Sequence, residues 1–468
     1  MTASHHGCDD HRRTLLSRRR ALRHAAAPAV PVPHDLLEGG AASFLAEGRS
    51  RREFLQGGVG AFLALSAVGG LGPRTLLEQA AAAGAEAADA PILVTLYLDG
   101  GNDGLNTLIP VAGQDRSVYD ARRRRIGIPA ERALPLPGHA ALGWHPQAVG
   151  LRTLFDSGQL AVLPAIDYPN PDFSHFHSSH FWRTGTLDEH AADGWLGRYL
   201  DVAGDVSNPL QGVAVQFGTD ELLLSRRAPT CALVAPGDFR FWSPVVWDPD
   251  AMMRTFASLG GEPRTPALGR AVAVARQTVQ VRSALAPLSA VKDENLPPTP
   301  VAYPDTDTGK GLRNLARMLG AGLGIRVATV RAAGGYDTHD DQPAQHGAQL
   351  ADLGDSLVAW QADLAARGLD RRVVTMVWSE FGRRVDDNDS NGTDHGAGGL
   401  MLLVSPRVRA GLHADAWDLS RLDRTDGNIR VAIDFRDVYA GLLEQHLGTE
   451  AGRVLPGYRG TPTRLMAA

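Results

Sequence analysis

Residues 91–98 form an uninterrupted run of mostly aliphatic side chains that ends at Asp99 and a glycine-rich turn. An apolar run of this length without alternation is typical of a strand buried on both faces, as in a parallel sheet. In open α/β sheets, ligands bind at the carboxyl ends of such strands. Gly100 and Gly101 allow the backbone to approach a ligand closely. The pattern therefore favours an α/β fold with Asp99 as the first ligand of a metal centre.

A repeated order of helix and strand follows this run. Further buried strands are predicted at residues 159–166, 210–217, 325–330, 372–379 and 399–404, and helices at 148–157, 194–201, 311–321 and 349–367. Such alternation predicts a doubly wound fold with helices on both faces of a mostly parallel sheet. Residues 105–110 are expected to continue extended, and the arginine run 122–125 to be solvated.

Length and charge limit the classes of protein to consider. The 468 residues suffice for one large α/β domain or two ordinary ones. Because the pattern loosens only between residues 218 and 304, we expect a single domain over 88–468 with a helical or irregular excursion there. The net charge is −5, and no basic patch with interleaved aromatic residues occurs, so nucleic acid is not expected as a partner.

The N-terminal residues carry the marks of an export signal. Residues 50–55 read Ser-Arg-Arg-Glu-Phe-Leu, which matches the twin-arginine pattern, and residues 85–87, Ala-Glu-Ala, match a small-residue cleavage site. The apolar stretch 57–70 between them is shorter than the roughly 20 residues of a spanning helix. We expect a signal peptide over 50–87, the twin-arginine translocation machinery as a partner, and a periplasmic or extracellular location without a stable transmembrane segment.

Two alternatives to export remain, a chance Arg-Arg pair before a helix and an uncleaved anchor. Residues 1–49 are an unusual extension in front of such a signal and are expected to be disordered. Cys8 and Cys231 are the only cysteines, and Cys8 lies in this extension. Removal of the leader would therefore leave no intramolecular disulfide.

Ser174 follows a loop with two prolines and begins a helical pattern. The N–H groups at a helix start favour anions, so Ser174 can face a phosphate or a sulfate. The alternative is a serine that only caps the helix. His175, His177 and His180 stand at i, i+2 and i+5 counted from the first, a spacing that does not bring all three to one helix face.

Other polar side chains lie where the later strands end or begin. Asp337 and His339 follow strand 325–330, Glu380 follows strand 372–379, and Asp394 and His395 precede strand 399–404. Mixed carboxylate and imidazole ligands suit Zn, Mn or Fe. Taken singly, each residue has an alternative interpretation as a helix cap or as a satisfied polar group at the sheet edge.

The polar loop 386–392 partly matches a calcium-binding loop. Its closing bidentate glutamate would fall at Gly398 and is missing, so an EF-hand is not expected. A flexible surface loop is the simpler interpretation.

These motifs resemble those of a known bacterial family. The segments that carry the resemblance are 98–106, 174–176, 194–198, 336–339 (Tyr-Asp-Thr-His), 379–382 (Ser-Glu-Phe-Gly) and 393–396 (Thr-Asp-His-Gly). Together they are similar to the domain-of-unknown-function 1501 family, whose members commonly carry twin-arginine signals. That family is grouped with the alkaline phosphatase and sulfatase superfamily. The resemblance implies a three-layer α/β/α sandwich and dependence on one or two divalent metal ions.

The resemblance also implies roles for single residues. Asp99 matches a bridging metal ligand, Ser174 the nucleophile, and Asp337 with His339 the ligand pair of one metal ion. Glu380 replaces an aspartate ligand, and His395 matches a late histidine with Asp394 beside it. Further candidates, as alternate ligands or as groups that orient the substrate, are Asn102, Asp103, His175 and His346.

Phe381 departs from the superfamily pattern, because relatives have a metal-binding histidine at that position. A second ion would then need Asp394, His175 or His177 as a substitute ligand. The expected function is that of an exported metal-dependent hydrolase of phosphate or sulfate esters, which acts on a small anionic ester through a serine nucleophile. The alternative is a catalytically degenerate, phosphatase-like binding or cell-surface protein.

Overall fold

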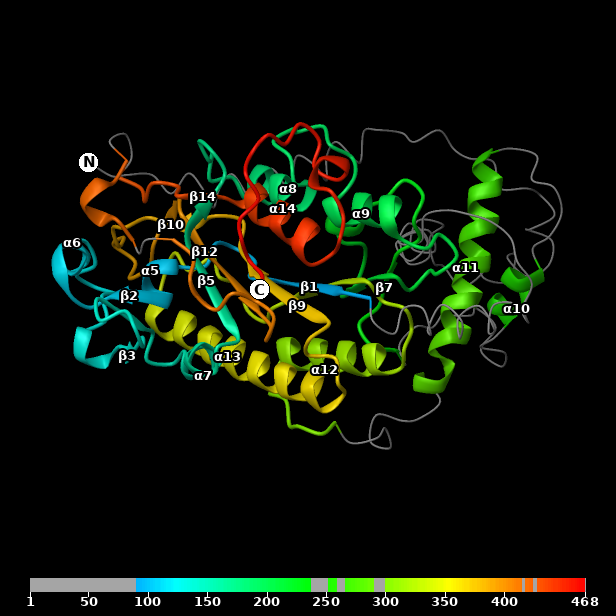
Figure 1. Ribbon diagram of the computed structural model, residues 1–468, viewed down its shortest axis with the longest axis horizontal. Coiled ribbons are helices and arrows are strands. Elements are labelled where there is room, and N and C mark those ends of the chain that lie inside the picture. The colour runs from blue at the N-terminus through cyan, green and yellow to red at the C-terminus, as the bar shows by residue number, and fades with distance from the viewer. Residues whose placement is uncertain are drawn as a thin grey trace, which may run out of the picture.

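A computed structural model of the protein describes residues 90–236, 251–258, 266–289, 299–414, 417–423 and 427–467. Within these ranges, one large sheet carries helices on both faces, which makes a three-layer α/β/α sandwich (Figure 1). The extension 1–49 and the signal peptide 50–87 that the sequence predicts lie outside the described residues.

The large sheet contains nine strands of the described chain. Their bounds are β1 (Ile92–Tyr97), β5 (Leu160–Asp167), β6 (Gly212–Val215), β7 (Cys231–Ala232), β8 (Val327–Arg331), β9 (Val373–Trp378), β12 (Gly399–Val404), β13 (Gly411–Leu412) and β14 (Ile433–Asp434). Their order is β13-β5-β12-β9-β1-β8-β6-β7, with β14 paired to β5. Strand β12 runs antiparallel to β5 and β9, whereas the other pairs are parallel. The predicted mostly parallel sheet is therefore confirmed.

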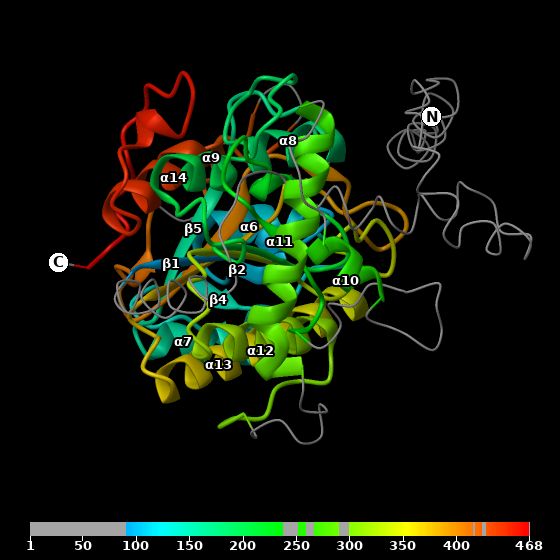
Figure 2. The ribbon, with the colours of Figure 1, turned by 90° about the vertical axis from the view of Figure 1, so that its right-hand side faces the viewer.

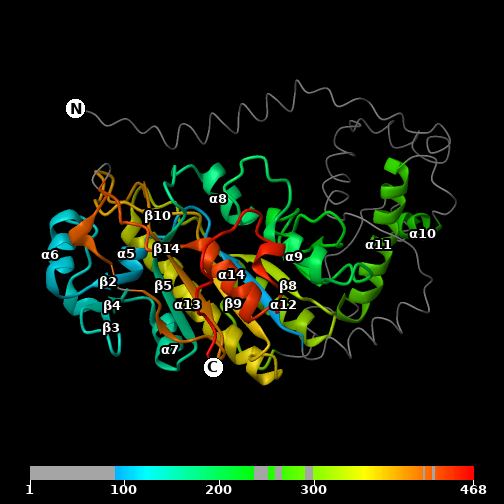
Figure 3. The same ribbon diagram turned by 45° about the horizontal axis from the view of Figure 1, so that its top comes forward.

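Helices of the described chain cover both faces of this sheet (Figures 1 and 2). On one face lie α7 (Val149–Asp156), α12 (Asp307–Gly320) and α13 (Gln342–Ala366), and on the other α8 (His175–Thr184), α9 (Trp195–Ala203) and α14 (Phe435–Gln445). The smaller elements include the helices α5 (Gly104–Thr107), α6 (Gly113–Arg122), α10 (Ala251–Ser258) and α11 (Pro266–Ser289). Helix α6 and helices α10 and α11 stand at opposite ends of the molecule (Figure 3).

Short strands and 3₁₀ turns complete the described elements. The strands β2 (Leu108–Pro110), β3 (Leu134–Pro135) and β4 (Leu142–Trp144) form one small sheet, and β10 (Gly382–Arg383) pairs with β11 (His395–Gly396). The 3₁₀ turns are η3 (Ala130–Arg132), η4 (Glu221–Leu223), η7 (Leu419–Arg421) and η8 (Ala451–Arg453).

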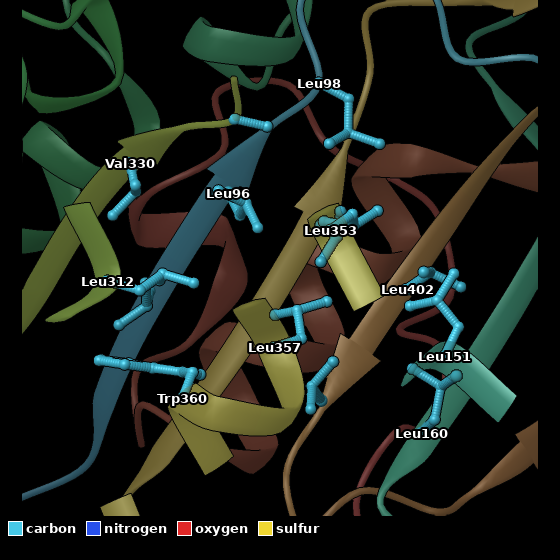
Figure 4. Close-up of a cluster of buried hydrophobic side chains, with 14 of the residues drawn as sticks. Leu96, Leu98, Leu151, Leu160, Leu312, Val330, Leu353, Leu357, Trp360 and Leu402 are labelled. Carbon is cyan, nitrogen blue, oxygen red and sulfur yellow. The ribbon is translucent and has the colours of Figure 1, made fainter. Parts of the chain in front are cut away.

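Strand β1 lies between two hydrophobic cores, because its side chains alternate between the two faces of the sheet. Leu93 and Tyr97 pack toward α8, α9 and α14, whereas Val94 and Leu96 pack toward α12 and α13. Figure 4 shows the core between the sheet and helices α12 and α13, in which Trp360 of α13 lies against the sheet. Burial of a large apolar side chain contributes about 1.5–3 kcal/mol. Burial on both faces therefore fixes β1, and with it the turn that follows.

The sequence-based bounds agree with most of these elements, and two expectations were wrong. Residues 104–107 form helix α5, because the Asp103 side chain accepts a hydrogen bond from the Asn106 N–H (3.2 Å) and caps a helical turn. Only Leu108–Pro110 is extended there. Helix α13 begins at Gln342, before the predicted residue 349, and it carries a proline in its first turn, where a missing N–H costs nothing.

Helices α7 and α13 approach closely at Gly150 and Gly354, which yields a first test of the packing. A Cβ atom on Gly150 would lie 2.2 Å from the carbonyl carbon of Gly354, which no rotamer change can relieve. Although alanine is the better helix former by about 1 kcal/mol, Gly150→Ala should lower the free energy of unfolding by about 1–3 kcal/mol. Chemical denaturation measures this. Gly452→Ala, at an exposed position without steric conflict, is the control, and a stabilised Gly150→Ala protein would contradict the prediction.

Candidate metal centre

The parallel strands β1, β8 and β9 end at the same edge of the sheet. Asp99 follows β1, Asp337 and His339 follow β8, and Glu380 follows β9. Two more segments reach this edge from elsewhere in the chain. Helix α8 begins with His175, and the reversed strand β12 is preceded by β11, which contains His395.

Three imidazoles surround the carboxylate of Asp337. The Nε2 atoms of His339 and His395 each lie 3.0 Å from Asp337 Oδ1, and His175 Nε2 lies 3.4 Å from Asp337 Oδ2. The Nε2 atoms of His339 and His395 are also 3.0 Å from each other. On a tetrahedral ion with metal–nitrogen bonds of 2.0–2.1 Å, neighbouring ligand atoms lie about 3.3 Å apart. On this scale, the Nε2 atoms of His339 and His395 and Asp337 Oδ1 lie close enough to share one ion, and His175 approaches the other oxygen of Asp337.

The opposite nitrogen of each ring is bound to an acceptor. His175 Nδ1 lies 2.9 Å from Glu380 Oε1, His339 Nδ1 lies 3.1 Å from Asp394 Oδ1, and His395 Nδ1 lies 3.0 Å from the carbonyl oxygen of Phe173. Because these oxygens only accept, each Nδ1 must carry the proton. Carboxylates and carbonyls orient metal-binding histidines in the same way. Glu380 and Asp394, both expected as ligands, here contact imidazoles.

The protonation of the rings decides what this group can bind. With each Nδ1 protonated, a neutral ring turns its Nε2 lone pair toward the centre, whereas a doubly protonated ring donates from Nε2 to its neighbour. Burial lowers the pKa of His395 to about 4, in spite of its hydrogen bond to Asp337. For His175, burial opposes the charged form, but hydrogen bonds to Asp337 and Glu380 raise its pKa to about 9. A proton occupies the Nε2 lone pair of one ring, whereas one metal ion can bind the lone pairs of several rings.

Asp337 is held ionised. Burial disfavours its charge, but hydrogen bonds from His175, His339 and His395 and the charge of Arg383 place the pKa of this carboxyl far below its ordinary value. Mixed nitrogen and oxygen donors suit Zn, Mn or Fe. The ligand atoms of His175, Asp337 and His395 all lie within 4.8 Å of one another, and His339 contacts Asp337 and His395 from outside this group.

Asp99 lies outside this group. Its carboxylate pairs with the guanidinium of Arg331, at the end of β8. The turn after Asp99 nevertheless contributes to the site, because the Gly100 N–H donates to both oxygens of Glu380 at 3.0 and 3.1 Å. This contact fixes the glutamate that orients His175. The positive φ of Gly100 (113°) and a clash of any Cβ atom with Asp337 require glycine there.

Asn102, Asp103 and His346 form a second polar cluster beside α5. His346 Nε2 lies 2.9 Å from Asn102 Oδ1, and Asp103 forms a buried ion pair with Arg123. The expectation of a solvated arginine run is thus wrong for Arg123, which is fully buried. None of the three candidates contacts the imidazole group through a hydrogen bond described in the structure.

Ser174 stands at the start of α8, and its side chain accepts a hydrogen bond from the His177 N–H at 3.5 Å. Its neighbours on both sides reach the centre, since the Phe173 carbonyl contacts His395 and His175 contacts Asp337. Phe173 has φ +60°, a left-handed conformation that costs a non-glycine residue about 1–2 kcal/mol. Such strain is typical of functional sites. Beside Ser174, the exposed His177 pairs with Asp172 at 2.5 Å.

Phe381 forms an aromatic wall next to these rings. It is fully buried, and its ring centroid lies 4.5 Å from that of His395 and 4.9 Å from that of His175. The ring also packs against Gly101, where a Cβ atom would lie 2.3 Å from it. This side of the centre therefore offers hydrocarbon and no metal ligand.

Arg383 connects three of the loops that build the centre, and no local sequence pattern singles it out. Its guanidinium is fully buried and donates to the carbonyl oxygens of Gly101 (2.7 Å) and Thr393 (2.7 Å) and to Asp337 Oδ1 (2.7 Å). Further bonds reach the carbonyls of Gly100 and Tyr336.

The acidic loop 386–392 is fastened to the arginine run. Asp386 pairs with Arg122 at 2.8 Å, and Asp389 pairs with Arg125 at 2.9 Å. Asp387 accepts the N–H of Arg125 at 2.6 Å. Arginine side chains thus supply countercharges for this acidic loop.

The buried histidine of the second cluster makes stability depend on pH. Burial lowers the pKa of His346 to about 3, against about 6.5 in an unfolded chain. The unfolded chain therefore gains a proton as the pH falls below 6.5, while the folded chain does not, so stability decreases. At pH 5 the expected loss is about 2 kcal/mol.

Urea denaturation at pH 7 and pH 5 measures this loss. His346→Gln should show a smaller loss between the two pH values than the unaltered chain, while replacement of the exposed His190 leaves the difference unchanged. Equal pH dependence in all three proteins would contradict the prediction.

Replacement of Arg383 by lysine should be costly, although the charge is kept. An ammonium group cannot reach three loops in the geometry of a guanidinium fork. Arg383→Lys should lower the free energy of unfolding by about 3 kcal/mol. Thermal and chemical unfolding measure this, with the exposed, ion-paired Arg152 replaced by lysine as the control. A loss of the same size in both variants would contradict the role of Arg383.

Comparisons with known proteins give a family. The model of DUF1501, described as a protein of unknown function, matches residues 164–467, more than half of the chain. No curated protein matches. Three similar solved structures are Ps i-CgsB in complex with k-i-k-neocarrahexaose (9% identity, 80% of this chain, 75% of that chain, TM-score 0.36), the PsFucS1 sulfatase from Pseudoalteromonas sp. (13%, 81%, 72%, 0.32) and the phosphonate monoester hydrolase SpPMH from Silicibacter pomeroyi (12%, 79%, 78%, 0.24). These TM-scores are too low to support an argument about activity. The family match shows that the chain belongs to the DUF1501 family.

Proposed function

We propose that the protein is a metal-dependent hydrolase of phosphate or sulfate esters. The observation that carries this proposal is the convergence of three oriented imidazoles on Asp337, directly beside the helix start that bears Ser174. A bound divalent ion would supply Lewis acidity and lower the pKa of a nearby hydroxyl group. His175, His339, His395 and Asp337 would hold it. The nitrogen-rich donor set favours Zn, with Mn and Fe as further candidates.

The residues around Ser174 suit an anionic ester. The hydroxyl group lies at the N-terminus of the ten-residue helix α8, where N–H groups and the helix dipole favour negative charge. In the proposed reaction, the Ser174 hydroxyl loses its proton and its oxygen attacks the phosphorus or sulfur atom, while the bond to the ester oxygen breaks and that oxygen takes up a proton. Water then hydrolyses the phosphorylated or sulfated serine, which releases phosphate or sulfate and restores the hydroxyl group. The neighbouring His177, which pairs with Asp172, can exchange these protons with solvent. We place a single ion here, because Phe381 covers one side and Arg331 binds Asp99.

Export by the twin-arginine route belongs to the same proposal. The signal-like pattern of residues 50–87 supports it, with the periplasm or the outside of the cell as the proposed location and the translocation machinery as the proposed partner. In the described part of the chain, no helix is both long and apolar enough to cross a membrane.

A second candidate function is that of a binding protein on a phosphatase-like scaffold without catalysis. The pairing of Asp99 with Arg331 favours it, because that carboxylate is then unable to act as a ligand unless the ion pair opens. The apolar wall of Phe381 favours it too, since it removes a ligand position that the resemblance implies.

Metal analysis and an ester panel distinguish the two functions. The purified chain should contain about one transition-metal ion per molecule and hydrolyse a phosphate or sulfate ester. Ser174→Ala should lose turnover by at least about a hundredfold and keep its metal. Ser179→Ala, on the same helix, is the matched control and should stay active. A metal-loaded chain that is inactive on every ester would favour the binding protein, and a chain without metal would contradict both the centre and the hydrolase.

A further inference from the structure

Gln342, the first residue of α13, joins two loops that carry the proposed metal ligands. Its side chain is fully buried. The amide oxygen accepts hydrogen bonds from the hydroxyl groups of Thr393 (2.6 Å) and Thr338 (3.1 Å), and the amide nitrogen donates to Asp103 Oδ2 (2.5 Å). Every polar atom of this amide thus has a partner.

The two threonines stand next to the proposed ligands in the sequence. Thr338 lies between Asp337 and His339, and Thr393 directly precedes Asp394 and His395. A backbone hydrogen bond from the Thr393 N–H to the Thr338 carbonyl oxygen (3.2 Å) also joins the loops. A single amide oxygen therefore fixes two segments of the chain, because Thr338 and Thr393 are 55 residues apart.

The amide nitrogen connects these loops to a rigid part of the fold. Asp103 caps α5 and forms an ion pair with Arg123, and both side chains are fully buried. The guanidinium of Arg123 also donates to the carbonyl oxygens of Val385 (3.1 Å) and Arg384 (2.9 Å). Breaking a buried ion pair costs about 3–5 kcal/mol, so this pair moves little.

We propose that Gln342 is a positioning residue that sets the metal affinity of the centre without touching the ion. This inference rests on the proposed metal site. Its physical basis is that the two loops it joins carry His339 and His395, whose Nε2 atoms lie 3.0 Å apart. Gln342 holds these loops together, so that the ligands are in place before the ion arrives. Such preorganisation increases affinity because less order has to be created on binding.

Only glutamine fits this position among side chains of similar length. Its oxygen accepts two hydroxyl protons while its nitrogen donates to a carboxylate. Glutamate would place a second negative charge beside Asp103, and methionine has the length but neither hydrogen-bonding function. The methionine variant therefore removes the connections with little change in volume.

The test compares two glutamines of the same helix. Gln342→Met is measured against Gln361→Met, which lies about 28 Å farther along α13. Gln361 is also buried and donates to Gln159 Oε1 at 3.3 Å. The dissociation constants of Zn²⁺ and Mn²⁺ are measured by competition with a chromophoric chelator, and the unfolding free energies are measured in parallel. Gln342→Met should bind the metal about tenfold to a hundredfold more weakly, and Gln361→Met should bind it as the unaltered chain does.

A mutant cycle tests whether the effect passes through the two threonines. The double variant Thr338→Val/Thr393→Val should lose about as much affinity as Gln342→Met, and the triple variant should lose little more, because all these changes remove the same connections. Thr393→Val alone should weaken binding by a smaller factor. It keeps the inference testable even where Gln342→Met does not fold.

The outcomes separate this inference from the proposed function. Unchanged affinity in Gln342→Met, or an equal loss in Gln361→Met, would overturn the inference and leave the metal centre in place. A graded loss of affinity in a chain that hydrolyses no ester would support the inference and count against the hydrolase. An unaltered chain that binds neither metal would overturn both.

Discussion

The loops at the carboxyl edge of the sheet depend on one buried guanidinium. Arg383 donates hydrogen bonds to the turn after β1, to the loop after β8 and to the segment before β11. Burying a charge is costly unless it is fully hydrogen-bonded and paired, and here carbonyl oxygens and the Asp337 carboxylate meet both conditions. Together with the hydrogen bonds of the three histidines, the same positive charge keeps Asp337 ionised in spite of its burial. Arg383 thus contributes to both the position and the charge of the central carboxylate.

Around that carboxylate, the hydrogen bonds of the imidazoles determine what the site can bind. Each Nδ1 atom is committed to an oxygen of Glu380, Asp394 or Phe173, so each Nε2 atom presents a lone pair to the centre. These hydrogen bonds therefore keep a proton on the Nδ1 atom of each ring. These lone pairs can accept a proton or a cation, and the start of α8, which favours anions, lies directly beside them. The proposed metal-bound anion would suit both features.

Much of this architecture can be predicted from the sequence, because long apolar runs mark buried strands and the residues after parallel strands meet at one edge. That reasoning leads to Asp337, His339 and His395. It could not separate His175 from His177 and His180, because helical spacing does not show which side of α8 faces the sheet. It also could not show which arginine of the run 122–125 is buried, since the partner of Arg123 is Asp103 on another element.

The direction of β12 was equally hidden, because an apolar run looks the same whichever way it pairs. Its reversal matters for the site. A strand that runs antiparallel to its neighbours begins at the edge where they end, and so His395, which precedes it, arrives at the centre. The pairing of Asp99 with Arg331 depends likewise on two strand ends that lie side by side only in the folded sheet.

The ion pairs that attach loop 386–392 make part of this loop sensitive to salt in the medium. The contacts of Asp386 and Asp389 with Arg122 and Arg125 are exposed, and dissolved salt screens exposed charges over about 8–10 Å at moderate concentrations. The buried bonds of Gln342 and Arg383 are shielded from that screening. At high salt concentration the ion pairs of Asp386 and Asp389 would weaken, while the buried hydrogen bonds at Thr393, next to Asp394 and His395, would persist. This two-part attachment separates His395 and the proposed metal centre from changes in the salt concentration of the medium.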